Sequence, residues 1–183
     1  GPRRHFMTRR FDRLEDGDKL HMQSLAAMAH LGFNQPGANS YEQAFTVTRQ
    51  LGLGQDVLDQ QFRRALFNIV GRNQDDHVKN IAFLMDRSGQ WRLAPGYDIS
   101  YQYNASGSWT NQHQMSLAGK RDRFTLEDLE TGGAVAGISR RAVRDMLAQV
   151  TKAVGRWRDI AQSVDVQPAF IAEIASMQRL DIR

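Results

Sequence analysis

The feature that most constrains the fold is a stretch of about sixteen residues, from Asp56 to Gly71, that predicts one helix apolar around much of its circumference. A helix with apolar residues on several sides is normally buried at the centre of a domain. We therefore expect a central helix here, with Asp56 as its N-cap. Its apolar residues are Val57, Leu58, Phe62, Ala65, Leu66, Ile69 and Val70.

The chain changes character directly after this helix. Residues 81–85 form a short apolar run that predicts a buried strand, residues 86–89 have the composition of a turn, and residues 90–93 predict a returning strand. Together they predict a β-hairpin.

Helices are predicted on both sides of this unit. A capping box at Ser40 and Gln43 opens one, Thr125 caps another, and Pro168 precedes a last one. Residues 100–124, rich in Ser, Asn, Gln and Tyr, predict a partly ordered surface segment. The fold class expected is mainly α with a central β-hairpin, and apolar periodicity predicts further helices over residues 20–31 and 140–161.

Composition excludes several classes of protein. The chain has 183 residues, about one domain, and no cysteine, which rules out disulfide frameworks, thiolate zinc sites and a cysteine nucleophile. No apolar run is long enough for a membrane helix and no signal-peptide pattern is present, so we expect a cytoplasmic protein.

The net charge of +4 is mildly basic. It is compatible with a partner that carries phosphates, but it does not require nucleic acid. Solvated surfaces are the favoured interpretation of the grouped basic residues and a nucleic-acid interface is the alternative. The groups are Arg3, Arg4, Arg9 and Arg10; Lys120, Arg121 and Arg123; and Arg140, Arg141 and Arg144.

Residues 73–80 carry the densest set of reactive side chains. Asp75 and Asn80 are five residues apart, the spacing of the base and the metal-binding carboxamide in protein-kinase catalytic loops. Asp98 follows the hairpin, which returns the chain toward its start. Phosphoryl transfer needs a carboxylate to accept a hydroxyl proton and hard oxygen ligands for Mg²⁺. Asp75 fits the first role, and Asn80 and Asp98 fit the second.

Neighbouring residues leave alternatives open. Lys79 is a candidate for neutralising charge on the transferred group, although a solvated or paired lysine is the simpler interpretation, as it is for Asp76. His77 is a candidate catalytic residue, or it only shapes the loop. Metal-assisted hydrolysis by Asp75, Asp76, His77 and Asp98 is a third, less favoured hypothesis.

These segments resemble the HipA-like serine/threonine kinases, toxins of bacterial type II toxin–antitoxin modules. The similarity extends from about Phe6 to about Trp157. The motifs that carry it lie at residues 10–13, 20–25, 40–43, 67–68, 73–80, 93–98 and 113–120.

The resemblance implies specific roles. Asp75 would be the catalytic base, Asn80 and Asp98 would bind Mg²⁺, and ATP would be the phosphoryl donor. Residues 14–183 would form the helical C-terminal lobe of a kinase-like enzyme. Residues 1–13 would combine a protease-cleavage scar, Gly1-Pro2, with a segment leading from the interlobe hinge, where Arg10 and Phe11 would contact the nucleotide.

The resemblance also implies partners. Members of the family phosphorylate protein serines or threonines, including those of aminoacyl-tRNA synthetases. They are held in check by a helix-turn-helix antitoxin that binds DNA, so contact with DNA would be indirect.

One departure from the family pattern affects the expected activity. No glycine-rich phosphate loop precedes Asp75, since Gly52-Leu53-Gly54 is too short, and Gly96 stands where alanine is more usual. We therefore expect the N-terminal lobe to be absent and the chain to be inactive or very weak as a kinase when alone. The alternative function is a non-catalytic module that binds an antitoxin, DNA or both.

Overall fold

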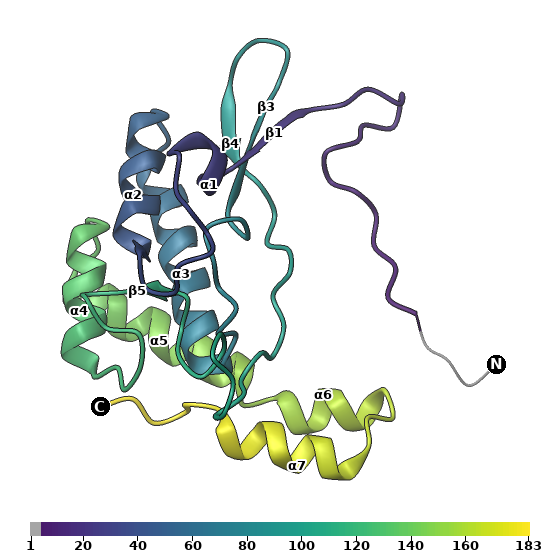
Figure 1. Ribbon diagram of the computed structural model, residues 1–183, viewed down its shortest axis with the longest axis vertical. Helices are drawn as coiled ribbons and strands as arrows, with labels where there is room; N and C mark the ends of the chain where they lie inside the picture. Colours follow the sequence, from purple (N-terminus) through teal and green to yellow (C-terminus); the bar gives the residue numbers. More distant parts are fainter. Residues whose placement is uncertain (1–4) are drawn as a thin grey trace.

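The computed structural model describes residues 5–183 (Figure 1). Gly1, Pro2, Arg3 and Arg4, and with them the predicted scar, lie outside the described residues.

Helix α3 (Gln55–Gly71) forms the centre of the domain, as predicted, and its Phe62, Leu66 and Ile69 are completely buried. Gly54 rather than Asp56 is its N-cap. Asp56 lies in the first turn, where its negative charge interacts favourably with the positive end of the helix dipole. Helices α2 (Tyr41–Gln50) and α5 (Arg140–Val154) pack on α3, and α4 (Leu126–Val135) packs on both of them.

The predicted capping box at the start of α2 is confirmed. The Ser40 hydroxyl accepts from the amide of Gln43 at 3.4 Å, and the Gln43 side chain accepts from the amide of Ser40 at 2.8 Å. Thr125 and Asp128 form a second box at the start of α4.

The predicted hairpin is present as β3 (Ala82–Met85) and β4 (Trp91–Leu93), but it belongs to a larger sheet. Strand β1 (His21–Ser24) pairs antiparallel with β3, giving the order β1-β3-β4. The helix predicted over residues 20–31 is therefore wrong. Only α1 (Leu25–Met28) is helical there, because β3 supplies a strand partner that the local apolar spacing does not reveal.

Residues 100–124 also differ from the prediction of a surface segment. Strand β5 (Met115–Ser116) pairs parallel with β2 (Asn39–Ser40), and residues 113, 114, 115 and 117 are almost inaccessible to solvent. The polar composition predicted exposure, whereas hydrogen bonds within the domain satisfy the polar groups.

The long helix predicted over residues 140–161 is interrupted. It ends at Val154, and α6 (Trp157–Ser163) begins two residues after Gly155, the C-cap of the first helix. Helix α7 (Pro168–Met177) starts at the predicted proline and packs beside α6 (Figure 1). None of the helices formed by residues 5–183 has the length and hydropathy needed to span a bilayer.

Candidate active site

The loop of residues 72–81 is anchored at both ends. Helix α3 stops because Arg72 adopts a left-handed conformation with φ of 61°, and its amide still bonds to the carbonyl of Asn68. At the other end, the amide of Leu25 donates to the carbonyl of Ile81 at 2.8 Å, and the amide of Ala26 donates to Val78 at 3.1 Å. The loop is thus fixed between the central helix and the β1–α1 junction.

Asn80 lies beside Asp75 in this loop, and Asp98 lies near enough to Asp75 to affect its pKa. The side-chain nitrogen of Asn80 donates to the main-chain carbonyl of Asp75 at 3.1 Å, which leaves the side-chain oxygen of Asn80 for another partner. Burial raises the pKa of Asp75, nearby His77 lowers it, and the negative charge of Asp98 raises it further. Asp98 has a φ of 53°, a conformation that Asp tolerates better than most residues.

This arrangement suits a divalent cation. Two carboxylates that influence each other electrostatically and a free carboxamide oxygen are the ligand types that Mg²⁺ prefers. Within residues 5–183, no group of three or more His, Asp or Glu side chains is arranged to hold a metal ion. A Mg²⁺ ion here would therefore take its remaining ligands from water or a nucleotide, as it commonly does.

His77 lies at the edge of this group. Its Nε2 is 4.0 Å from a carboxylate oxygen of Asp75, which is longer than a hydrogen bond. Its Nδ1 is buried without a hydrogen-bond partner, and its ring meets Phe33 edge-on with 6.1 Å between centroids. These contacts fit the loop-shaping interpretation, while a direct chemical role stays a prediction.

Lys79 points elsewhere. Its Nζ lies over the ring of Phe33, 3.1 Å from the centroid, and Lys79 is not among the charges that shift the pKa of Asp75. The main chain of Lys79 is held more firmly, because the Tyr97 hydroxyl donates to its carbonyl at 2.5 Å. That bond ties the residue before Asp98 to the residue before Asn80.

The two residues predicted to contact the nucleotide differ in their surroundings. The Phe11 ring packs on Tyr97, with 5.7 Å between centroids, so it lies next to the segment that carries Asp98. Arg10 instead makes a two-pronged ion pair with Asp12 at 2.8 and 2.6 Å. This pairing raises the pKa of Arg10 and lowers the pKa of Asp12.

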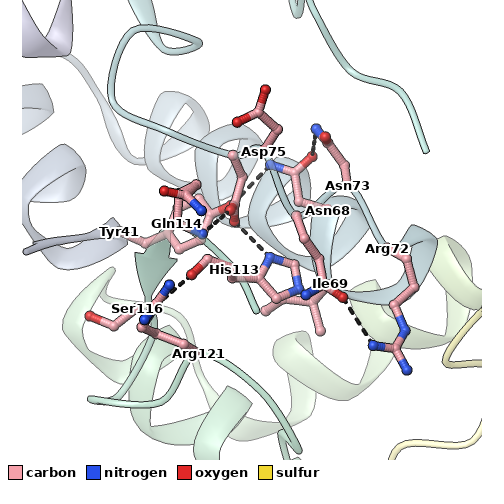
Figure 2. Close-up of polar contacts among 12 residues, drawn as sticks. Tyr41, Asn68, Ile69, Arg72, Asn73, Asp75, His113, Gln114, Ser116 and Arg121 are labelled. Carbon is pink, nitrogen blue, oxygen red and sulfur yellow. Dashed lines mark hydrogen bonds and ion pairs between the residues drawn. The ribbon is translucent and has the colours of Figure 1, made fainter. Parts of the chain in front are cut away.

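Sequence reasoning missed a buried network centred on Asp76. This carboxylate accepts hydrogen bonds from the Tyr41 hydroxyl at 2.6 Å, the His113 ring at 2.8 Å and the Gln114 amide at 2.8 Å. Asn68 donates to the Tyr41 oxygen at 2.9 Å. Figure 2 shows the network, with the Asp75 carboxylate directed away from it.

The network fixes the ionisation of Asp76. Burial alone would raise the pKa of Asp76, but His113 and the donated hydrogen bonds outweigh burial and lower it. Burial and the Asp76 charge raise the pKa of Tyr41, which stays a hydroxyl donor. Since both Asp76 oxygens already accept hydrogen bonds, Asp76 is not free to bind a metal, and the hydrolysis hypothesis loses one of its ligands.

All five residues of this network lie in segments that carry the family resemblance, at residues 40–43, 67–68, 73–80 and 113–120. The polar pair His113-Gln114 directly precedes the buried apolar residues Met115 and Leu117. The network residues are distant along the chain, and nothing in their segments indicates that the side chains meet.

Comparisons with known proteins identify a family for this chain. A family model described as the HipA-like C-terminal domain matches residues 1–157. HipA of Shewanella oneidensis MR-1, in a structure described as a toxin–antitoxin complex with HipB and its operator DNA, is similar at a TM-score of 0.74 and 18% identity. The match covers 91% of this chain but 45% of that chain, so this chain spans less than half of that protein. A search of curated proteins gave no match.

Proposed function

Since this chain belongs to the family of HipA-like C-terminal domains, we propose that it is the catalytic region of an ATP- and Mg²⁺-dependent protein serine/threonine kinase of a toxin–antitoxin system. The observation that carries the proposal is that Asn80 is hydrogen-bonded to Asp75 within one anchored loop, while Asp98 lies near enough to Asp75 to affect its pKa. In this proposal the helical domain is the C-terminal lobe of a kinase-like fold.

In this proposal Asp75 acts on the hydroxyl of the acceptor serine or threonine. The Asp75 carboxylate accepts the hydroxyl proton, and its raised pKa makes it a stronger base than an ordinary aspartate. The Asn80 and Asp98 oxygens would hold Mg²⁺, which would neutralise phosphate charge when bound with ATP. The Asp76 network keeps the main chain next to Asp75 in place, so the base does not have to be ordered when substrate binds.

Lys79 and Phe11 have supporting roles in the proposal. The exposed Lys79 side chain would turn from Phe33 toward the transferred phosphoryl group, whose charge it would offset. Phe11 offers an aromatic surface beside Tyr97 to the nucleotide base. Arg10 would contact nucleotide only if its ion pair with Asp12 opened, which makes it the weaker candidate.

Activity of the isolated chain is expected to be low. The residues align with less than half of the neighbouring HipA chain, and we propose that the phosphate-binding loop comes from outside them. Losing those contacts would remove several kcal/mol of transition-state stabilisation, and each ~1.4 kcal/mol is a tenfold loss of rate.

The proposed partners follow from the family. The acceptor would be a serine or threonine of a protein, with aminoacyl-tRNA synthetases as one candidate class. A helix-turn-helix antitoxin would bind the protein and connect it to DNA, as the neighbour's description, which includes HipB and operator DNA, supports.

Direct DNA binding by the basic groups has less support. Arg144 and Arg140 lie 2.7 and 3.6 Å from the Glu130 carboxylate, and Lys120 lies 2.7 Å from Asp128. These pairs engage three of the six cations in two of the basic groups, so a non-catalytic DNA-binding module remains the alternative but not the favoured function.

ATP binding tests the proposal. Calorimetric titration of the 183-residue chain should give measurable affinity for ATP with Mg²⁺ and much weaker affinity when Mg²⁺ is replaced by EDTA. Equal affinity in the two conditions would remove Asn80 and Asp98 from metal binding.

A further inference from the structure

A groove opens where the chain leaves Asp98. It has a volume of about 450 Å³ and lies between α3, α5 and the segment that follows β4, in the size range of ligand-binding clefts. Its floor is mainly apolar, and it includes Phe67 and Ile99, each 40% exposed. The residues that matter here are Arg63, Arg64, Phe67, Gly96, Ile99 and Gln149.

Arg64 is the unusual member of this groove. Its guanidinium is half-buried, and burial lowers the pKa of Arg64, opposed only by the nearby Tyr97 phenol. Within the part of the chain that the structure describes, Arg64 has no ion pair and no side-chain hydrogen bond. A partly desolvated cation without a counter-charge is costly unless a ligand provides one.

Arg64 also connects the groove to the candidate active site. The same side chain lines a smaller, more enclosed cavity together with His77 and Asn80. A Cβ atom placed at Gly96 would lie 3.9 Å from Arg64 Nε, an ordinary contact distance, so the Arg64 side chain lies beside the main chain at Gly96. The guanidinium therefore lies close to the main chain two residues before Asp98.

The charged residues that line the groove are all positive. Arg63 and Arg64 both line it, and no aspartate or glutamate does. Arg63 donates to the neutral Gln149 at 2.5 Å, so its charge is not neutralised either. An occupant complementary to this surface carries a negative charge beside an apolar group.

We propose that this groove binds the protein substrate through an acidic residue, whose carboxylate pairs with Arg64 while an adjacent apolar side chain packs on Phe67 and Ile99. The inference rests on the proposed function, because it places this acidic residue near the serine or threonine that Asp75 deprotonates. The apolar floor favours a peptide over DNA, whose backbone offers charge without apolar side chains.

Peptide binding to the 183-residue chain tests this proposal. The probe is a dye-labelled peptide in which glutamate and then leucine follow a serine, measured by fluorescence anisotropy. A second peptide carries lysine in place of glutamate. We expect at least tenfold tighter binding of the glutamate peptide, with a preference that shrinks as salt is raised. Equal binding of the two peptides, or no binding of either, would overturn the proposal.

Variants locate the site. Arg64→Gln should weaken the glutamate peptide at least fivefold, and Arg64→Lys should retain most of the affinity. Gln149→Glu, at an exposed position that tolerates change, should also weaken it by placing a negative charge beside Arg63. Arg87→Gln, which removes an arginine from the hairpin turn, is the control and should bind as the wild type does. Unchanged affinity in folded Arg64→Gln and Gln149→Glu would place the peptide elsewhere and refute the proposal.

Two further measurements separate this inference from the function it rests on. ATP titration in parallel shows whether the nucleotide site works: glutamate-peptide preference without ATP binding would support the groove and contradict the kinase. ATP binding without a preference for the glutamate peptide would support the kinase and overturn the peptide proposal. Displacement of the peptide by duplex DNA, lost in Arg64→Gln, would identify the groove as a nucleic-acid site and overturn the peptide proposal.

Discussion

His113 Nε2 lies 3.0 Å from a guanidinium nitrogen of Arg179, while His113 Nδ1 lies 2.8 Å from the Asp76 carboxylate. Because arginine can only donate, Nε2 must accept, and Nδ1 then carries the proton that bonds to Asp76. A residue just after α7 therefore sets the orientation of the imidazole toward Asp76. Arg179 is held in turn by an ion pair with Asp122.

Replacing Arg179 with methionine should lower the free energy of unfolding by about 1–3 kcal/mol, because Nε2 of His113 is left buried without a donor. Urea unfolding at pH 7 measures this loss. Arg183→Met is the matched control, since that arginine is exposed and pairs with the exposed Asp181. Equal stability of the two variants would show that the bond to His113 contributes nothing.

Asp76→Asn should destabilise the protein by about 3 kcal/mol or more at pH 7, since it breaks a buried charged network. The effect should depend on pH. The pKa of Asp76 is lowered by folding, so the charged carboxylate stabilises the protein above the unfolded-state pKa of about 3.9, and this contribution is lost as pH falls through the lower folded-state value.

The measurement is urea unfolding of wild type and Asp76→Asn at pH 7 and at pH 3. The difference in stability should shrink at pH 3, while the exposed Asp159→Asn control should match the wild type at both. A difference that is constant with pH would show that the ionised carboxylate is not what stabilises the network.

Asp75→Asn, unlike Asp76→Asn, should not destabilise the protein at pH 7. Burial raises the pKa of Asp75, so the folded protein favours the neutral form, which stabilises below the unfolded-state pKa and is lost as pH rises. The neutral asparagine should leave stability at pH 7 unchanged or higher by at most about 0.5 kcal/mol, because the side chain is partly exposed.

In a full-length protein containing this region, the same Asp75→Asn change should reduce phosphorylation of protein at least about a hundredfold, the scale of general-base catalysis. ATP binding should persist. A phosphorylation rate equal to the wild type would remove Asp75 from the mechanism.

Asp98→Asn should weaken Mg²⁺-dependent ATP binding about tenfold or more, because one negative ligand is neutralised. Asparagine is the appropriate substitution, since it tolerates the positive φ at this position. Calorimetric titration compares the variant with Asp159→Asn, an exposed carboxylate on α6. An equal loss in both variants would attribute the effect to overall charge rather than to a metal ligand.

The sequence predicts local features of this fold well. The capping box at Ser40, the buried helix before Arg72 and the hairpin around residues 86–89 each depend on residues a few positions apart. The pairing of Asp75 with Asn80 is local in the same way, and the hairpin makes the return of Asp98 foreseeable. Their roles as base and metal ligands stay predictions.

What the sequence did not predict depends on long-range contacts. Strand β1 is extended because it pairs with β3, about 60 residues later, and this pairing overrides an apolar spacing that also fits a helix. His113 is buried because Asp76 and Arg179, from distant parts of the chain, satisfy its two nitrogens. A polar composition cannot distinguish this from exposure.

The β1–α1 junction gives the domain a mechanical property. The segment before β1 extends away from the helices (Figure 1), and just beyond β1 the amides of Leu25 and Ala26 bond to Ile81 and Val78, on either side of Asn80. Tension on that leading segment would therefore be transmitted to the Asn80 turn through two hydrogen bonds, whereas Asp76 and its partners would hold the opposite side of the loop still.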